Sequence, residues 1–182
     1  MAIEIKRYSA EEFEQFVRLP EHADRRFELI GGEIVDVVSN NYSSLVAMRI
    51  GARLLVFVEN RQSGYVTGAD GGYVVSGERY IPDAAYISKE RQPDPSHEAY
   101  NPTPPDLAVE VLSPTDEPDR MRFKIVNYLR AGTTVWVVDP EKHHIEVYAP
   151  GSAPQIVRQD GTLDGGDVLP GFTLAVKDIF PE

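Results

Sequence analysis

The sequence contains no cysteine. Disulfides, thiolate metal sites and a cysteine nucleophile are therefore excluded, and any metal ion must be held by oxygen or imidazole ligands. Histidine offers no convincing ligand set either, because the four histidines lack the HExxH spacing, and we expect all of them to be surface groups: His22, His97, His143 and His144. Oxygen ligands remain, and the lack of thiols fits a reducing compartment.

Long apolar runs are also missing. No stretch approaches the roughly 18 consecutive apolar residues of a membrane-spanning helix. The first residues, "MAIEIKRYSAEEF", have no apolar core of the kind found in a secretory signal peptide. We therefore expect no membrane association and a cytoplasmic location.

Basic residues are scarce, with 18 Lys and Arg against 29 Asp and Glu, and the net charge is −11. A protein whose whole surface grips nucleic acid has the opposite balance, because non-specific DNA affinity comes from lysine and arginine that displace counterions from phosphates. Any DNA binding would have to use a local basic patch.

The predicted elements alternate helices with short strands. Ser9 followed by Glu12 is the pattern of a capping box, which predicts a helix directly after Ser9. The further predictions are a hairpin in "FELIGGEIVDVV", a helix from about Ser43 to Glu59, strands around "GYVV" and "YIPDAAYIS", a surface loop over 89–105, the strand "DLAVEVL", a helix from about Glu117 to Ala131, the strand "TVWVVDP", and hairpin-like pieces up to Phe180. This order predicts an α/β fold, a mixed sheet flanked by helices, in a single domain spanning residues 1–182.

One glutamate, Glu110, interrupts the apolar strand of "PPDLAVEVLSPTD". Strand alternation places Glu110 and Ala108 on one face and Leu107, Val109 and Val111 on the other, which we interpret as the core face. The small Ala108 leaves room beside the carboxylate. A charge at this position calls for a functional explanation.

Asp83 is the better acidic partner for Glu110. Asp106 lies four residues earlier on the same strand, roughly 13 Å away, too far to share a metal ion whose ligand distances are about 2 Å. Asp83, with the small Ala85 at the same parity, can lie about 5 Å away on a neighbouring strand. We therefore pair Asp83 with Glu110 and interpret Asp106 as a strand-entry residue. The alternative is that both carboxylates point into solvent from an exposed sheet face.

A larger set of motifs carries a family resemblance. The succession "FELIGGEIV", "GADGGYVV", "IPDAAYI" and "PPDLAVEVLSP", then Asp119, Lys124, Tyr128 and Gly132 ahead of "VWVVDP", and finally "LPGFTL", resembles the Uma-two family of restriction endonucleases. That family is a branch of the PD-(D/E)XK nuclease superfamily, and the likeness extends over nearly the whole chain. Each motif alone is weak, whereas their order and spacing together are specific.

The resemblance implies a restriction-endonuclease-like core that hydrolyses DNA phosphodiester bonds with Mg²⁺ or Mn²⁺. It implies Asp83, Glu110, Lys124 and Glu28 as catalytic residues, and Asp83, Glu110 and Val111 as the metal ligands. Carboxylates hold such a hard cation, which polarises the phosphate and acidifies a water, while a lysine steadies developing negative charge. It also implies a homodimer, because related nucleases often pair to address two strands.

Two positions depart from the family pattern. The lysine expected two residues after Glu110 is Leu112, and the resemblance places it instead on the following helix, at Lys124. A histidine that the family often has at the start of the second helix is replaced by Ser43 and Ser44. These departures and the acidic charge leave open an alternative, a catalytically inactive nuclease fold that serves as a binding or scaffold module.

The helix after the Glu110 strand decides where Lys124 lies. Such a helix can return its second turn to the carboxyl end of the strand, and Lys124 is its only lysine. We expect the ammonium to lie within about 6 Å of the Asp83 and Glu110 carboxylates. Their negative charge should favour the protonated form of Lys124. We also expect Lys124→Ala to lower turnover by roughly 10² while leaving the fold intact. The alternative is a solvated helix face, which applies to the whole basic set of this helix: Arg120, Arg122, Lys124 and Arg130.

Overall fold

The structure, a computed structural model, describes residues 6–181. Its helices are α1 (Ala10–Val17), α2 (Asn41–Arg61) and α3 (Pro118–Arg130), with short 3₁₀ turns η1 (Pro20–His22) and η2 (Val176–Asp178). Its strands are β1 (Phe27–Ile30), β2 (Glu33–Asp36), β3 (Gly64–Gly68), β4 (Gly72–Val75), β5 (Glu78–Tyr80), β6 (Ala84–Ser88), β7 (Tyr100–Asn101), β8 (Leu107–Val111), β9 (Thr134–Asp139), β10 (His144–Tyr148), β11 (Gln155–Arg158), β12 (Thr162–Asp164) and β13 (Thr173–Ala175). The predicted mixed α/β fold class is confirmed.

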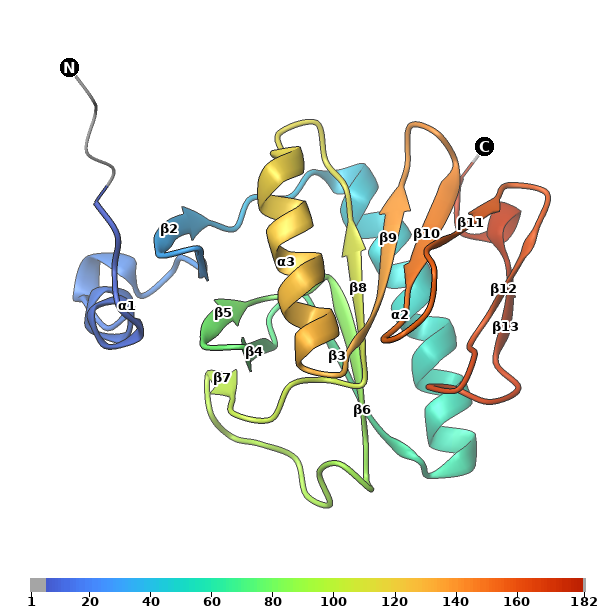
Figure 1. Cartoon of the computed structure of the whole chain (residues 1–182), viewed down its shortest axis with the longest axis horizontal. Coiled ribbons are helices and arrows are strands. Elements are labelled where there is room, and N and C mark those ends of the chain that lie inside the picture. Colours follow the sequence, from blue (N-terminus) through green and yellow to red (C-terminus); the bar gives the residue numbers. More distant parts are fainter. Residues whose placement is uncertain (1–5, 182) are drawn as a thin grey trace.

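The largest sheet has six strands in the order β11-β10-β9-β8-β6-β3. Strands β8 and β9 are parallel and are joined through α3, whereas the other neighbours pair antiparallel. Figure 1 shows α3 in front of this sheet and α2 behind it. Because helices cover both faces, the central strand β8 is buried at every residue, as in sheets whose strands read as continuous apolar runs.

The predicted face parity of β8 holds, but neither face is solvated. Leu107, Val109 and Val111 belong to the core cluster under α2, and Ala108 belongs to a second cluster under α3. Glu110 shares the α3 side and is only 5% exposed. The alternative of a solvent-facing Glu110 on an open sheet face is therefore wrong.

A second sheet has five strands in the order β2-β1-β5-β4-β7. Its β1–β2 hairpin turns at Gly31 and Gly32, both with positive φ, as the glycine pair predicted. The segment "YIPDAAYIS", expected to be one strand, is instead divided between this sheet (β5) and the six-stranded sheet (β6). Pro82 lies at the break, where it cannot donate a ladder hydrogen bond, so Asp83 occupies the junction of the two sheets.

Several local predictions can be compared directly. Ser9 and Glu12 form the expected capping box at the start of α1. The prediction for His144 is wrong, because it is 7% exposed on β10 with Nε2 3.2 Å from Oε1 of Glu146. Strand β3 was not anticipated, since "GYVTG" is bounded by glycines that weaken its strand signal. No helix among residues 6–181 is both long and apolar enough to cross a bilayer.

Candidate active site

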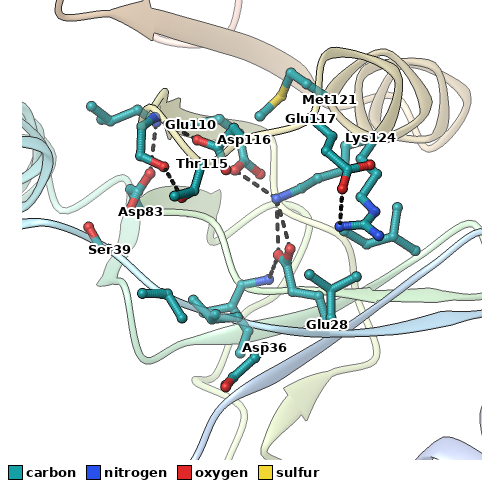
Figure 2. Close-up of a pocket in the computed structure, with 18 residues that line it drawn as sticks. Glu28, Asp36, Ser39, Asp83, Glu110, Thr115, Asp116, Glu117, Met121 and Lys124 are labelled. Carbon is teal, nitrogen blue, oxygen red and sulfur yellow. Dashed lines mark hydrogen bonds and ion pairs between the residues drawn. The ribbon is translucent and has the colours of Figure 1, made fainter.

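A cavity of about 340 Å³ opens where α3 faces the junction of the two sheets. Four predicted residues line it together: Glu28 of β1, Asp83 of the β5–β6 link, Glu110 of β8 and Lys124 of α3. Figure 2 shows the Lys124 ammonium between the carboxylates of Glu110 and Glu28, with Asp83 beside them. The fold thus brings residues from four separate elements into one site.

Lys124 is the centre of the polar network. Its side chain is buried, and Nζ donates to Glu110 Oε2 at 2.7 Å and to Glu28 Oε1 and Oε2 at 3.0 and 3.3 Å. Burial alone would lower the pKa of Lys124, but the charges of Glu110 and Glu28 outweigh burial and hold the pKa above its usual value. The Tyr80 ring lies 5.4 Å from the ammonium and adds a cation–π contact. The alternative of a solvated Lys124 is wrong.

Glu110 has a donor at each carboxylate oxygen. Besides Lys124 at Oε2, the Tyr128 hydroxyl donates to Oε1 at 2.8 Å. Burial raises the pKa of Glu110 to about 8, although the Lys124 charge acts in the opposite direction. Burial and the Glu110 charge also raise the pKa of Tyr128 well above its usual value, so the phenol stays protonated and keeps donating.

Asp83 meets the end of β8. In the antiparallel β6–β8 pair, Ala84 faces Val109, so Asp83 lies one register step beyond, level with Glu110. Asp83 Oδ2 accepts the main-chain N–H of Val111 at 2.7 Å. Burial raises the pKa of Asp83 to about 6 against the effect of that hydrogen bond. The Val111 side chain is apolar, so this residue can offer a cation only its main-chain carbonyl oxygen.

Glu28 joins the two sheets at the site. It is 7% exposed, and its Oε1 accepts the N–H of Ile81 at 2.6 Å in addition to the Lys124 contacts. The strand β1 therefore fixes the chain immediately before Asp83. Glu28 holds Lys124 from the side opposite Glu110.

The donor set suits a hard divalent cation. Glu28, Asp83 and Glu110 are three carboxylates against the single ammonium of Lys124, and this surplus of buried negative charge adds to the raised pKa values of Asp83 and Glu110. Within residues 6–181 no group of three or more His, Cys, Asp or Glu side chains is placed to hold a metal ion. Magnesium fits such a site, because it retains several waters, binds through one or two carboxylates and is completed by substrate phosphates.

The structure adds residues that the sequence prediction did not assign to the site. Tyr128 lies four residues after Lys124, and that helical spacing was the available signal. Asp116 and Thr115 line the cavity from the loop after β8, and Asp116 accepts the N–H of Ser113 at 2.6 Å. No periodic pattern marks a loop residue of this kind.

Other predicted features lie outside the carboxylate cluster. Asp106 accepts the N–H of Ser88 at 2.7 Å and pairs with Arg91 at 2.9 Å, in keeping with a structural strand-entry role. On α3, Arg120 pairs with Glu33 and Glu117, and the exposed Arg122 pairs with Asp119, so the solvated-face alternative holds for Arg122. Ser43, at the position of the missing histidine, is buried and donates to the carbonyl of Leu112 at 3.2 Å.

Comparison with known proteins finds similarity to nucleases. The sequence profile of the Uma2 (Uma-two) family, described as "Putative restriction endonuclease", matches residues 13–177. A crystal structure from Anabaena variabilis ATCC 29413, described as a "putative nuclease belonging to DUF820", superposes with a TM-score of 0.80 at 20% identity, covering 92% of this chain and 96% of that chain. No curated protein matches the chain. Because the family profile spans most of the sequence, this chain belongs to the Uma2 family of restriction-endonuclease-like proteins.

Proposed function

We propose that the protein is a magnesium- or manganese-dependent endonuclease that hydrolyses DNA phosphodiester bonds. The observation that carries this proposal is the convergence of Glu28, Asp83, Glu110 and Lys124 on one cavity. Family membership supports nuclease chemistry in general, and the choice of DNA and of the metal rests on the family resemblance and the oxygen donor set.

The residues divide into distinct roles. Asp83, Glu110 and the main-chain carbonyl of Val111 would hold the cation, which when bound polarises the scissile phosphate and lowers the pKa of a bound water. Lys124, held protonated by its carboxylate partners, stabilises negative charge that develops on the phosphate. Glu28 positions Lys124, and Tyr128 orients the Glu110 carboxylate.

One observation favours the alternative of an inactive binding or scaffold module. Both oxygens of Glu110 are already engaged, by Lys124 and Tyr128, in a closed network of buried hydrogen bonds. A network of this kind can serve stability alone. In that case metal ions would neither bind at the cavity nor support cleavage.

A cleavage assay separates the two functions. Plasmid and single-stranded DNA are incubated with the wild type in magnesium, manganese or chelator, alongside Glu110→Gln and the control Glu59→Gln, which changes an exposed carboxylate of α2. The proposal expects metal-dependent cleavage by the wild type and the control, and loss of at least about 10² in rate with Glu110→Gln. Equal traces of cleavage in all three proteins would identify a contaminant and contradict the proposal.

The proposal extends to assembly and location. We propose a homodimer, because two copies address the two strands of a duplex, and a cytoplasmic site of action, in keeping with the cysteine-free composition. Sedimentation velocity over a range of concentrations tests the dimer. A monomer at every concentration, with and without DNA, would contradict it.

A further inference from the structure

A second cavity, of about 390 Å³, adjoins the carboxylate cavity on the side of α1 and η1. Ile81 lines both cavities. Asp36, which lines the first, pairs with Arg25 of the second at 2.6 Å. The two cavities are therefore neighbours, with Ile81 and the Arg25–Asp36 pair at their boundary.

The second cavity is rich in arginine. Its basic side chains come from η1, its flanks and β5: Arg18, His22, Arg25, Arg26 and Arg79. Three acidic residues also line it: Glu14, Asp70 and Glu98. Four arginines in one cavity are a strong local concentration in a chain of net charge −11. Four arginines against three acids leave the lining with one formal positive charge, whereas nucleic-acid binding by such an acidic protein depends on local positive charge.

The arginines differ in their availability to a ligand. Arg79 is held at 10% side-chain exposure by Glu14, with 2.7 Å between them. Arg25 and Arg26 pair with Asp36 and Asp70, but these four side chains are between 40% and 76% exposed. Exposed pairs of this kind contribute little stability, so a phosphate can replace the aspartate.

Two further details favour an anionic ligand. Arg18 is exposed, and its side chain has no ion pair or hydrogen bond to any other residue within 6–181. The Arg25 guanidinium packs over the Phe27 ring at 4.8 Å, which restricts its orientation. A guanidinium oriented in advance loses less entropy when it forms two parallel hydrogen bonds to a phosphate.

We propose that Arg18, Arg25 and Arg26 bind the phosphate backbone of the nucleic-acid strand next to the scissile bond. This inference rests on the proposed nuclease function and assigns the substrate a direction, from the carboxylate cavity past Ile81 to η1. The three arginines fix the register of the strand and do not read its bases. They supply the positive charge that the carboxylate cavity lacks.

The test measures binding rather than cleavage. A fluorescent duplex and a fluorescent single strand are titrated by anisotropy, in calcium, with the wild type, with Arg18→Gln/Arg25→Gln/Arg26→Gln, and with the matched control Arg122→Gln/Arg130→Gln/Arg158→Gln. The control removes the same number of exposed arginines, from α3 and β11, and none of them lines either cavity. The affinity of the first variant should fall by about tenfold or more, and its salt slope should drop by about 2 to 3, because each lost phosphate contact removes about 0.7 to 0.9.

A second variant separates contact from net charge. In Arg25→Gln/Arg26→Gln/Asp36→Asn/Asp70→Asn the net charge equals that of the wild type, and binding should still be weakened. The arginine proposal would be overturned if this variant bound DNA as tightly as the wild type, or if the triple variant and its control lost equal affinity. Neither result would contradict the proposed nuclease function. If the wild type binds neither probe, the proposed function fails and the arginine proposal fails with it.

Discussion

Lys124 is at once the centre of the buried network and the proposed charge stabiliser. Because its ammonium bonds Glu28 and Glu110 in a buried site, Lys124→Met would leave two carboxylates facing each other without a cation. Removing one partner of a buried ion pair costs about 3 to 5 kcal/mol, so the variant should be less stable by about that amount at pH 8, in addition to its loss of turnover. The same argument applies to Lys124→Ala, whose fold should be intact but less stable.

Urea unfolding with chelator present measures this effect. The loss of stability should be smaller at pH 5, where Glu110 binds a proton and the repulsion between Glu28 and Glu110 falls. The Arg122→Met variant is the control, since that side chain is 75% exposed. A Lys124→Met protein as stable as the wild type at pH 8 would contradict the structural role of the ammonium.

The raised pKa values of Asp83 and Glu110 predict how stability depends on pH in the metal-free protein. The folded pKa values are about 6 and about 8, whereas the unfolded values are about 3.9 and 4.3. Between these limits the folded state binds more protons than the unfolded state, so the free energy of unfolding falls as the pH rises. The contribution of Asp83 is lost by about pH 6 and that of Glu110 by about pH 8.

The two contributions can be separated by substitution. In Glu110→Gln, the free energy of unfolding should no longer fall between pH 6 and pH 8. Its fall below pH 6, which comes from Asp83, should remain. Denaturant unfolding at half-unit steps of pH, with chelator, provides the measurement. If the free energy of unfolding changes with pH equally in the wild type and in Glu110→Gln from pH 6 to pH 8, the raised pKa of Glu110 is refuted.

At the scale of elements, the β1–β2 hairpin sets the position of Glu28. Gly31 has φ +60 and Gly32 has φ +79, which matches a turn with two left-handed residues. Gly31→Val should cost about 1 to 2 kcal/mol of stability, since left-handed backbone is unfavourable for a branched residue. Gly31→Asn should be nearly neutral, because Asn-Gly is a preferred pair in this turn. Thermal unfolding measures the stability of both variants. An equal loss of stability in both would exclude backbone strain as the cause of the loss.

Element type was predictable wherever periodicity or capping chemistry is local. The capping box of α1, the Gly-Gly hairpin and the strand around Glu110 all follow from short-range pattern. The division of "YIPDAAYIS" between two sheets was not predictable, because it depends on which distant strands β5 and β6 pair with. The predicted alternation nevertheless placed Asp83 and Glu110 at one cavity, because Asp83 follows the register of β6.

The site was predictable as a set of residues but not as a network. Strand parity and the family motifs supplied Asp83, Glu110, Lys124 and Glu28, and all four line one cavity. The Tyr128 contact to Glu110 and the closed Lys124 network depend on how α3 packs against two sheets. Helical spacing places Tyr128 on the same face as Lys124, but the hydrogen bonds themselves depend on tertiary packing distances that a single sequence does not give.

At the scale of the whole molecule, charge separates into two adjoining cavities. One is lined by six acidic residues with Lys124 and Arg120, and the other is lined by four arginines with three acidic residues. The net charge of −11 repels a polyanion from most directions, so productive approach depends on these local fields. In the proposed function, the scissile phosphate of the substrate would lie at the acidic cavity and the neighbouring phosphates at the arginines.

The acidic cavity should therefore make DNA binding dependent on divalent cations even without hydrolysis. Glu28, Asp83 and Glu110 outnumber the single ammonium of Lys124, so a phosphate entering the metal-free site meets net negative charge. Calcium, which takes the same oxygen ligands but does not support the reaction geometry of magnesium, should tighten binding of a labelled duplex by about tenfold, or about 1.4 kcal/mol. Anisotropy at matched ionic strength measures this change against chelator.

The double variant Asp83→Asn/Glu110→Gln is the control. It should bind the duplex about equally well in calcium and in chelator, since its cavity has lost both the cation ligands and the surplus negative charge. A wild type that binds with the same affinity under both conditions would show that no cation is needed between these carboxylates and the phosphate.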